Sequence, residues 1–403
     1  MINRLLKKVD EIGPEVILHF YDPSTGTKGV IVIDTTMPVG AAFGGTRMLP
    51  DITTEEIVLL ARAMTHKFAI IGAPVGGAKF GIWADPDVSG PKREAIFEAL
   101  GRVVRPFLST QALLGVSVDI GTNLQDAATT YEAAGVSTAP GYVASVPMEV
   151  GKQLEEHVTG LGVVITAKAA CEFAGIALDG ATVAIEGFGK AGSGVVRYMV
   201  EEGARIVALS TIDGAIYNEK GLDIAKLLKM REEYGDKAVV SYKEAKHIDK
   251  EEIYFLPVDI LAPGARLHVI TRDNAHLVRA KVICGPANMP VTDEAEEILF
   301  QRGIHSVPDF IANAGGVLTV AANLAGGIAG DPLVYLKELQ GSVLKSITLS
   351  ILSNAGEKGV NPRRLAIEMV KEKILKARAE RKKEEPLVAL QKWIDDVRKR
   401  FDL

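Results

Sequence analysis

The chain has 403 residues, which is too long for one compact core, so we expect two domains. Hydrophobic residues make up 47% and charged residues 24% of it, a balance typical of a globular protein rather than a disordered or fibrous one. With 46 basic and 51 acidic residues the net charge is −5, which excludes a chain-wide positive field for holding nucleic acid or an anionic membrane. Small molecules are therefore the expected partners.

The chain has only two cysteines, Cys171 and Cys284, too few for a disulfide framework and not spaced as a metal-binding pair. The histidines show no metal-ligand spacing such as HExxH, so no metal site is expected. Residues 1–12 carry charges without a long apolar run, so neither a secretory signal nor a membrane span is expected. Together these observations predict a cytoplasmic protein.

Two β-rich runs open the chain. EVILHFYD (15–22) and KGVIVID (28–34) flank a segment with proline and glycine, which is typical of a hairpin. Thr53 and Glu56 then form a capping box before a run with helical spacing, and we expect that helix to end near His66 or Lys67.

A glycine-rich stretch, IIGAPVGGAKFGI (70–82), follows that helix. Its glycines and proline predict a loop that can approach a ligand closely, with Lys79 on it. Residues 93–108 predict a second helix, and the apolar run LLGVSVDIGTN (113–123) predicts a strand that places Asp119 at its end.

The pattern changes near residue 159. Helical periodicity over 163–173, an apolar strand at 181–189, a helix from Gly192 and a further strand at 204–210 predict a β-α-β unit. Later strands alternate with helices, which predicts a mostly parallel, doubly wound sheet. We therefore expect an α/β protein with an N-terminal α/β domain (1–150), a Rossmann-like dinucleotide-binding domain (151–330) and C-terminal helices (331–403). The charged run 371–385 is interpreted as the solvated face of one of those helices.

The motif GFGKAG (187–192) follows a predicted strand and opens a predicted helix. Glycines in this position allow a tight turn, backbone approach to a pyrophosphate and close packing of helix on strand, and the pyrophosphate lies on the positive end of the helix. The predicted cofactor-binding residues are those of the motif: Gly187, Phe188, Gly189, Lys190, Ala191 and Gly192.

The end of the next strand, which reads the ribose in such folds, carries Ser210 and Thr211. The acid expected there is absent or displaced to Asp213. A pair of hydroxyls does not repel a 2′-phosphate, and Lys190 adds positive charge, so NADP is favoured while NAD remains open.

Lys67 and Lys79 differ from ordinary surface lysines, because one ends an apolar-faced helix and the other follows paired glycines. If both point into one cleft, each cation lowers the pKa of the other and both attract a carboxylate-bearing substrate.

Four blocks, in matching order and spacing, carry a resemblance to a known family over nearly the whole chain. They are FGGTRM (43–48), MTHKFAIIGAPVGGAKFGI (64–82), VDIGTNLQD (118–126) and PDFIANAGGV (308–317), joined by GFGKAG and GPANMPVTDEAEEIL. The sequence resembles the glutamate/leucine/phenylalanine/valine dehydrogenase family, whose members deaminate an amino acid to its 2-oxo acid with a nicotinamide cofactor.

The resemblance implies a role for each matching residue. Lys67 would bind the substrate α-carboxylate, Lys79 would be the catalytic lysine that activates water, and Asp119 would move a proton to and from the substrate nitrogen. A lysine of lowered pKa beside a carboxylate suits such proton transfers. Gly44 and Gly45 would let backbone close over the substrate.

Three further residues match family positions that hold the nicotinamide and the polar groups of the substrate. These are Thr159, Asn288 and Asn313, although a helix cap is an equally plausible role for Asn313.

Side-chain selectivity also follows from the resemblance. Glutamate-specific members place a lysine before the paired glycines and a hydroxyl seven residues after the asparagine of NAGGV, where this chain has Phe43 and Val320. A pocket lined by Phe43, Val317 and Val320, with Ser117 nearby, would leave a buried carboxylate unpaired. An apolar amino acid is thus expected, and the bulk of Phe43 and Phe80 favours a small one.

The leading hypothesis is a reversible NAD(P)-dependent amino acid dehydrogenase that takes up or releases ammonia. A glutamate dehydrogenase with an atypical pocket and a catalytically idle nucleotide-binding relative are the alternatives. The resemblance also implies that the first domain binds substrate and builds a homo-oligomer, for which a hexamer is the guess.

Overall fold

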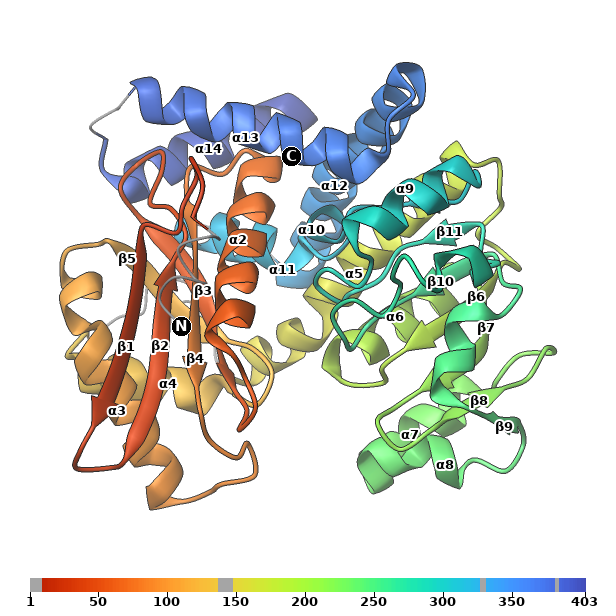
Figure 1. The fold of residues 1–403 in the computed structure, drawn as a ribbon, viewed down its shortest axis with the longest axis horizontal. Coiled ribbons are helices and arrows are strands. Elements are labelled where there is room, and N and C mark those ends of the chain that lie inside the picture. Colours follow the sequence, from red (N-terminus) through yellow and green to blue (C-terminus); the bar gives the residue numbers. More distant parts are fainter. Residues whose placement is uncertain (1–8, 137–147, 327–330, 381–383) are drawn as a thin grey trace. The chain divides into compact units, whose positions relative to one another are not determined.

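The computed structural model describes residues 9–136, 148–326, 331–380 and 384–403, with backbone alone for 148–156. The chain divides into two compact units, each assembled from separate stretches (Figure 1). Unit 1 comprises Met1–Lys152, Val317–Ala329 and Met369–Leu403, and unit 2 comprises Gln153–Gly316 and Gly330–Glu368. No helix of the described residues is both long and apolar enough to cross a membrane.

Unit 1 is built on a five-stranded sheet of order β1-β2-β4-β3-β5. Strands β1 (Val16–Asp22) and β2 (Thr27–Ile33) form the expected antiparallel hairpin. Strand β4 (Gly76–Ile82) pairs antiparallel with β2 and parallel with β3 (Ala42–Met48), which pairs parallel with β5 (Leu113–Val118).

Helix α2 (Thr54–Ile71) covers one face of this sheet. Its N-cap Thr53 accepts the backbone N–H of Glu56, which is one half of the expected capping box, while the side chain of Glu56 binds Arg47. The helix does not end near Lys67 but continues to Ile71, because Phe68, Ile70 and Ile71 are buried, and it stops at Gly72, whose φ is 78°.

The part of the glycine-rich stretch that carries Lys79, Gly76–Ile82, is a strand and not the expected loop. Its glycines serve packing rather than loop flexibility: a Cβ on Gly76 would lie 1.7 Å from the carbonyl oxygen of Thr35, and one on Gly77 2.2 Å from the backbone nitrogen of Thr65. Neither position has space for a side chain, and the segment that contains them and Lys79 is strand β4.

The opposite face of the sheet packs on helices α3 (Pro91–Ser109) and α4 (Leu124–Ala134). The core between them holds side chains of alternate strand positions and of both helices, including Ile31, Ala42, Phe80, Phe97, Leu100 and Tyr131. Because strand side chains alternate between faces, the remaining positions of β3 and β4 face α2.

Unit 2 contains a seven-stranded sheet of order β12-β11-β10-β6-β7-β8-β9. Its strands are β6 (Thr182–Glu186), β7 (Arg205–Ser210), β8 (Ala215–Tyr217), β9 (Lys246–Ile248), β10 (Ile260–Ala262), β11 (Val282–Ile283) and β12 (His305–Ser306). The first five in spatial order are parallel, and β8 and β9 extend that sheet antiparallel at one edge. The expected α/β fold with a doubly wound, mostly parallel sheet is confirmed.

The helices of the second half are α5 (Met148–Phe173), α6 (Lys190–Glu201), α7 (Ile224–Tyr234), α8 (Ala238–Ser241), α9 (Asp293–Gln301), α10 (Asp309–Ala312), α11 (Gly315–Leu324), α12 (Pro332–Lys358), α13 (Pro362–Glu380) and α14 (Pro386–Phe401). Within unit 1 the indole of Trp393 on α14 donates to the carbonyl of Ile71 at 3.3 Å. The charged run 371–385 is mostly exposed on α13 where described, and residues 381–383 lie outside the described residues.

Candidate active site

Lys79 is buried on the face of β4 that α2 covers, with 6% of its side chain exposed. Its partner in the β3 register is Gly45, which in turn pairs with Ser117 of β5. The absence of a side chain at Gly45 leaves space between Lys79 and the end of β5. A Cβ on Gly45 would lie 2.7 Å from the carbonyl oxygen of Val118.

Asp119 follows β5 directly and fills the far side of that space. Its Oδ2 lies 2.9 Å from Nζ of Lys79. The backbone N–H of Asp119 donates to Oγ1 of Thr122 at 2.9 Å, and that hydroxyl also bonds the carbonyl of Thr46. The turn after β5 is thus tied to β3, and the structure brings together the two residues expected to be catalytic.

Two charged residues that sequence reasoning passed over complete this cluster. Arg47 on β3 donates from Nε to Oδ2 of Asp119 at 2.9 Å and from Nη1 to Oε1 of Glu56 at 2.6 Å. Arg47 lies inside the FGGTRM block, and every residue of that strand is buried. An arginine within such an apolar strand is the feature that could have indicated a functional residue. Glu56 was interpreted only as part of a helix cap.

The cluster sets the protonation of both expected catalytic groups. Burial lowers the pKa of Lys79 below its usual range, and Arg47 adds to this effect while Asp119 opposes it. Burial alone would raise the pKa of Asp119, but the cations Lys79 and Arg47 outweigh it and hold that pKa well below its usual range. The site therefore pairs a firmly ionised carboxylate with a lysine that releases its proton more readily than usual.

The other residues expected to bind substrate lie in unit 1, except Asn288, which lies in unit 2. Lys67 is buried on α2, and Ser117 is half-buried on β5. Packing requires a glycine at position 44, because a Cβ there would lie 1.9 Å from the carbonyl oxygen of Ala78. Val317 and Val320 are buried on α11.

The two bulky aromatic residues face opposite sides of the sheet. Phe43 is buried with its ring edge-on to Phe68 of α2, the centroids 6.3 Å apart. Phe80 belongs to the core under α3 and α4, on the face away from Lys79. The expectation that Phe80 narrows the substrate pocket is therefore wrong, since adjacent strand residues point to opposite faces.

The GFGKAG segment of unit 2 forms the expected strand–turn–helix. Gly187 follows β6 with φ 85°, and a Cβ on Gly192 would lie 1.9 Å from the carbonyl oxygen of Gly187. Gly189 is the N-cap of α6, where a Cβ would meet no described atom within 4 Å. Phe188 is buried, Ala191 is half-buried, and Lys190 is exposed.

The N-terminus of α6 is suited to an anion. No side chain of the described residues caps it, and its first turn has no acidic residue. Exposed N–H groups at a helix start bind phosphates. The loop after β10 closes on the same region, since Gly264 and Ala265 donate their N–H groups to Glu186. β10 and β6 are adjacent parallel strands, so this is the crevice where doubly wound sheets bind ligands.

At the end of β7, Ser210 and Thr211 are both buried. The hydroxyl of Thr211 donates to the carbonyl of Asp236 at 2.8 Å, so it is engaged within the protein. Asp213 lies exposed in the turn that follows.

The three expected polar contacts of the nicotinamide lie in unit 2. Nδ2 of Asn313 donates to the carbonyls of Pro286 and Ala287 and to Oδ1 of Asn288. Its own Oδ1 is buried and accepts no hydrogen bond from the described residues. Thr159 is half-buried, and a Cβ on Gly316 would lie 3.3 Å from its Oγ1.

A salt-bridged clamp supports the loop that carries Asn288. Met289, whose φ is 46°, donates its N–H to Oδ2 of Asp309 at 2.9 Å. The other oxygen of Asp309 binds Nη1 of Arg363, whose Nε lies 3.0 Å from Asp293. Sequence reasoning missed this clamp because Arg363 is far from Asp309 in the chain.

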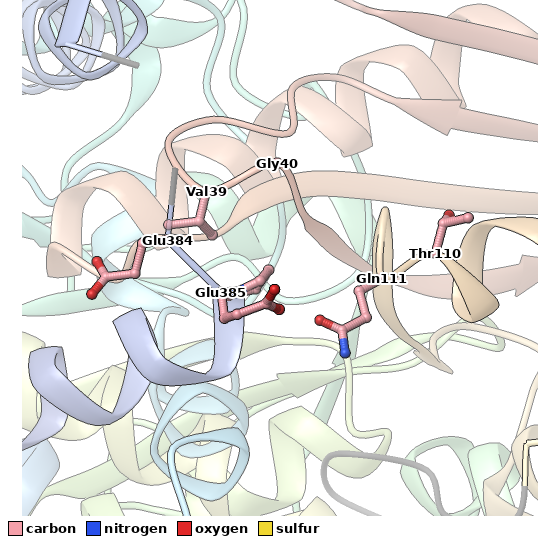
Figure 2. Close-up of a pocket in the computed structure, with 7 residues that line it drawn as sticks. Val39, Gly40, Thr110, Gln111, Glu384 and Glu385 are labelled. Atoms are coloured by element: carbon pink, nitrogen blue, oxygen red, sulfur yellow. The ribbon is translucent and has the colours of Figure 1, made fainter. Parts of the chain in front are cut away.

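A hollow elsewhere in unit 1 is lined by Val39, Gly40, Thr110, Gln111, Glu384, Glu385 and Pro386 (Figure 2). None of the expected site residues lines it, so it takes no part in the candidate site.

A glycine turn of dinucleotide-binding type in unit 2 and a buried lysine–aspartate pair in unit 1 fit a nucleotide-dependent oxidoreductase. A family model described as Glutamate/Leucine/Phenylalanine/Valine dehydrogenase matches residues 151–382, and one described as Glu/Leu/Phe/Val dehydrogenase, dimerisation domain, matches residues 14–134. The chain belongs to this family and is an amino acid dehydrogenase, as the sequence motifs indicated.

Similar proteins agree with this assignment. Glutamate dehydrogenase of Thermotoga maritima is 38% identical over 289 residues, 69% of this chain and 68% of that protein. NAD-specific glutamate dehydrogenase of Staphylococcus aureus is 37% identical over 284 residues, 69% of this chain and 68% of that protein. The expectation of NAD or NADP as cofactor thus agrees with the family.

Two solved structures share the fold over nearly the whole chain. Hetero-hexameric glutamate dehydrogenase from Thermus thermophilus, in a Leu-bound form, has a TM-score of 0.81 at 25% identity and covers 95% of this chain and 96% of its own. L-tryptophan dehydrogenase from Nostoc punctiforme has a TM-score of 0.63 at 26% identity and covers 93% of this chain and 99% of its own.

Proposed function

We propose that the chain oxidatively deaminates an apolar L-amino acid to its 2-oxo acid and ammonia, and catalyses the reverse reductive amination. The observation that carries this proposal is the contact of 2.9 Å between Nζ of Lys79 and Oδ2 of Asp119. A buried lysine of lowered pKa beside a fixed carboxylate can transfer protons to and from a water molecule and an amine.

Each residue has one task in this scheme. Lys67, as the second buried lysine, binds the substrate α-carboxylate. Lys79 takes a proton from the water that attacks the imino acid, and Asp119 exchanges a proton with the substrate nitrogen. Deamination consumes that water and releases ammonia.

The residues of unit 2 fit a nicotinamide dinucleotide. The uncapped start of α6 and the open space at Gly189 suit a pyrophosphate. The Oδ1 of Asn313 is buried and accepts no hydrogen bond from the described residues, so it suits the N–H groups of a carboxamide. When bound, the nicotinamide supplies the two-electron acceptor that an oxidative deamination requires.

The identity of the dinucleotide is a finer part of the proposal, and NADP is favoured. Neither Ser210 nor Thr211 places a carboxylate at the end of β7, and Lys190 is exposed in the glycine loop. The exposed Asp213 is the residue that would favour NAD instead.

An apolar substrate is supported by Phe43, Val317 and Val320, all buried and without a charge for a distal carboxylate. A glutamate dehydrogenase in which another cation binds the distal carboxylate is the second candidate. It is favoured because the relatives in Thermotoga maritima and Staphylococcus aureus are glutamate dehydrogenases.

We also propose a homo-hexamer, which analytical ultracentrifugation of the purified chain would test.

A spectrophotometric panel tests the substrate. The purified chain is assayed with each common L-amino acid, and with 2-oxo acids plus ammonia, using NAD and NADP in turn. Highest kcat/KM on an aliphatic or aromatic amino acid supports the proposal, and highest kcat/KM on glutamate supports the second candidate. Tight binding of a dinucleotide without turnover of any amino or oxo acid would identify an inactive relative.

A further inference from the structure

Four charged side chains of unit 1 form an alternating row, Glu56–Arg47–Asp119–Lys79. The row joins helix α2, strand β3, the turn after β5 and strand β4. Two acids and two bases balance in charge, which makes their burial tolerable. The catalytic pair is therefore the end of a longer, partly buried network.

Both cations of the row bind the same carboxylate oxygen. Nε of Arg47 and Nζ of Lys79 each lie 2.9 Å from Oδ2 of Asp119. No described residue bonds to Oδ1 of the same carboxylate, whose side chain is 18% exposed. The arrangement fixes the rotation of the carboxylate and leaves one oxygen for a ligand.

Arg47 is held more firmly than a surface arginine. Its side chain is 8% exposed, it emerges from a fully buried strand, and its second bond, to Glu56, fixes the guanidinium from the other side. An arginine does not lose its proton in proteins, whereas a buried lysine can. Arg47 thus remains a cation beside Asp119 when Lys79 is neutral.

We infer that Arg47 is a positioning residue of this site: it fixes Asp119 through Oδ2, so that Oδ1 meets the substrate nitrogen, and keeps Asp119 ionised while Lys79 releases its proton. This inference rests on the proposed function, because it assigns Arg47 to the proton transfers of Lys79 and Asp119.

The electrostatics of Lys79 agree with this role. The charged groups that act on it are Asp119 after β5, Arg47 on β3 and Glu56 on α2, and its neighbour on β2 is the apolar Val32. Arg47 lowers the pKa of Lys79, so its removal raises that pKa. Deamination needs neutral Lys79. In a variant without Arg47, the acidic limb of the pH profile of deamination therefore moves to higher pH.

The test compares the full-length variants Arg47→Met, Arg47→Lys and Arg62→Met with the parent chain. Arg62 is the matched control, a largely buried arginine on α2 that binds Asp34 and Asp10 instead of the site. All four proteins are measured for thermal stability, dinucleotide affinity, KM and kcat across pH. Competitive acetylation of Lys79 with acetic anhydride, followed by mass spectrometry, reports its protonation without turnover.

For Arg47→Met we expect kcat to fall about 10- to 100-fold, with dinucleotide affinity within about twofold. The acidic limb should shift upward by at least about half a pH unit, and the acetylation profile of Lys79 should move the same way. Arg47→Lys should have a higher rate than Arg47→Met but a lower one than the parent, since it keeps the positive charge but lacks the planar, two-sided donor geometry of the guanidinium. Arg62→Met should lose stability without any shift of the limb.

An Arg47→Met protein with the same kcat and the same acidic limb as Arg62→Met would overturn the inference. The proposed function would fail differently, through a parent chain that oxidises no amino acid or a Lys79→Met variant that keeps its rate.

Discussion

Gly45 of β3 pairs in register with Lys79 of β4, so the lysine has a neighbour without a side chain on the face of the sheet that carries the site. The same glycine lets the turn after β5 approach, since its Cβ would lie 3.4 Å from Cβ of Asp119. Strand register thus helps to bring the two residues expected to be catalytic, Lys79 and Asp119, into contact.

Replacing Lys79 by alanine should lower kcat about 100- to 10,000-fold, because the proposed general base is lost. Dinucleotide affinity should stay nearly intact, since the glycine loop belongs to the other unit. Stopped-flow or steady-state assays and a fluorescence titration measure the two effects. Lys28→Ala, at an exposed position of β2, is the control and should keep the parent rate. A near-normal rate in the Lys79 variant would refute the assignment.

Phe43→Lys should admit acidic substrates if this ring lines the substrate pocket. A charged hydrogen bond to a distal carboxylate contributes about 1.5–3 kcal/mol, so kcat/KM for glutamate relative to the best apolar amino acid should rise about 10- to 100-fold. Phe43→Leu is the control for lost ring packing against Phe68 and should keep the apolar preference. An unchanged order of substrates in the lysine variant would count against the pocket.

Two glycines of the loop after β6 should respond differently to alanine. In Gly189→Ala the new Cβ meets no described atom within 4 Å, so the free energy of unfolding should change by less than about 1 kcal/mol while dinucleotide affinity falls. Gly192→Ala places a Cβ 1.9 Å from the carbonyl oxygen of Gly187 and should cost about 1–3 kcal/mol of stability. Urea denaturation and calorimetric titration separate the effects. Unaltered dinucleotide affinity in Gly189→Ala would place the pyrophosphate elsewhere.

Glu296 on α9 should make the stability of the protein depend on pH. Burial raises its pKa from 4.5 to about 7, with Asp309 and Asp293 adding to the effect and Arg363 opposing it. The folded protein therefore favours the protonated acid. The resulting stability is fully present below pH 4.5 and is lost as the pH rises through about 7.

Glu296→Gln, which mimics the protonated acid, should match the parent near pH 4.5. It should exceed the parent by about 2–4 kcal/mol well above the raised pKa. Urea midpoints across this range measure the difference, with Glu294→Gln on the same helix, an exposed position, as the control. Equal midpoints for the parent and the Glu296 variant at every pH would show that folding does not raise the pKa of this carboxyl.

Much of the architecture could be predicted from local patterns. The hairpin of β1 and β2, the cap at Thr53 and the sequence of strand, glycine turn and helix at Gly187–Gly192 depend on residues close together in the chain. The prediction for the segment around Lys79 was wrong, because its glycines are typical of a loop when only neighbouring residues are considered. In the fold these glycines are needed because Thr35 and Thr65, distant in sequence, leave no space for a side chain.

The sequence by itself determined the family and the reaction class, because the order and spacing of motifs can be recognised without coordinates. The same motifs predicted Lys67, Lys79 and Asp119 as site residues. Only the tertiary structure decided that Lys79 lies on a strand, that Phe80 faces away from it, and that Arg47 and Arg363 hold Asp119 and Asp309. The physical reason is that face and charge pairing depend on strand register and on packing between distant segments. A pattern read along one segment does not contain that information.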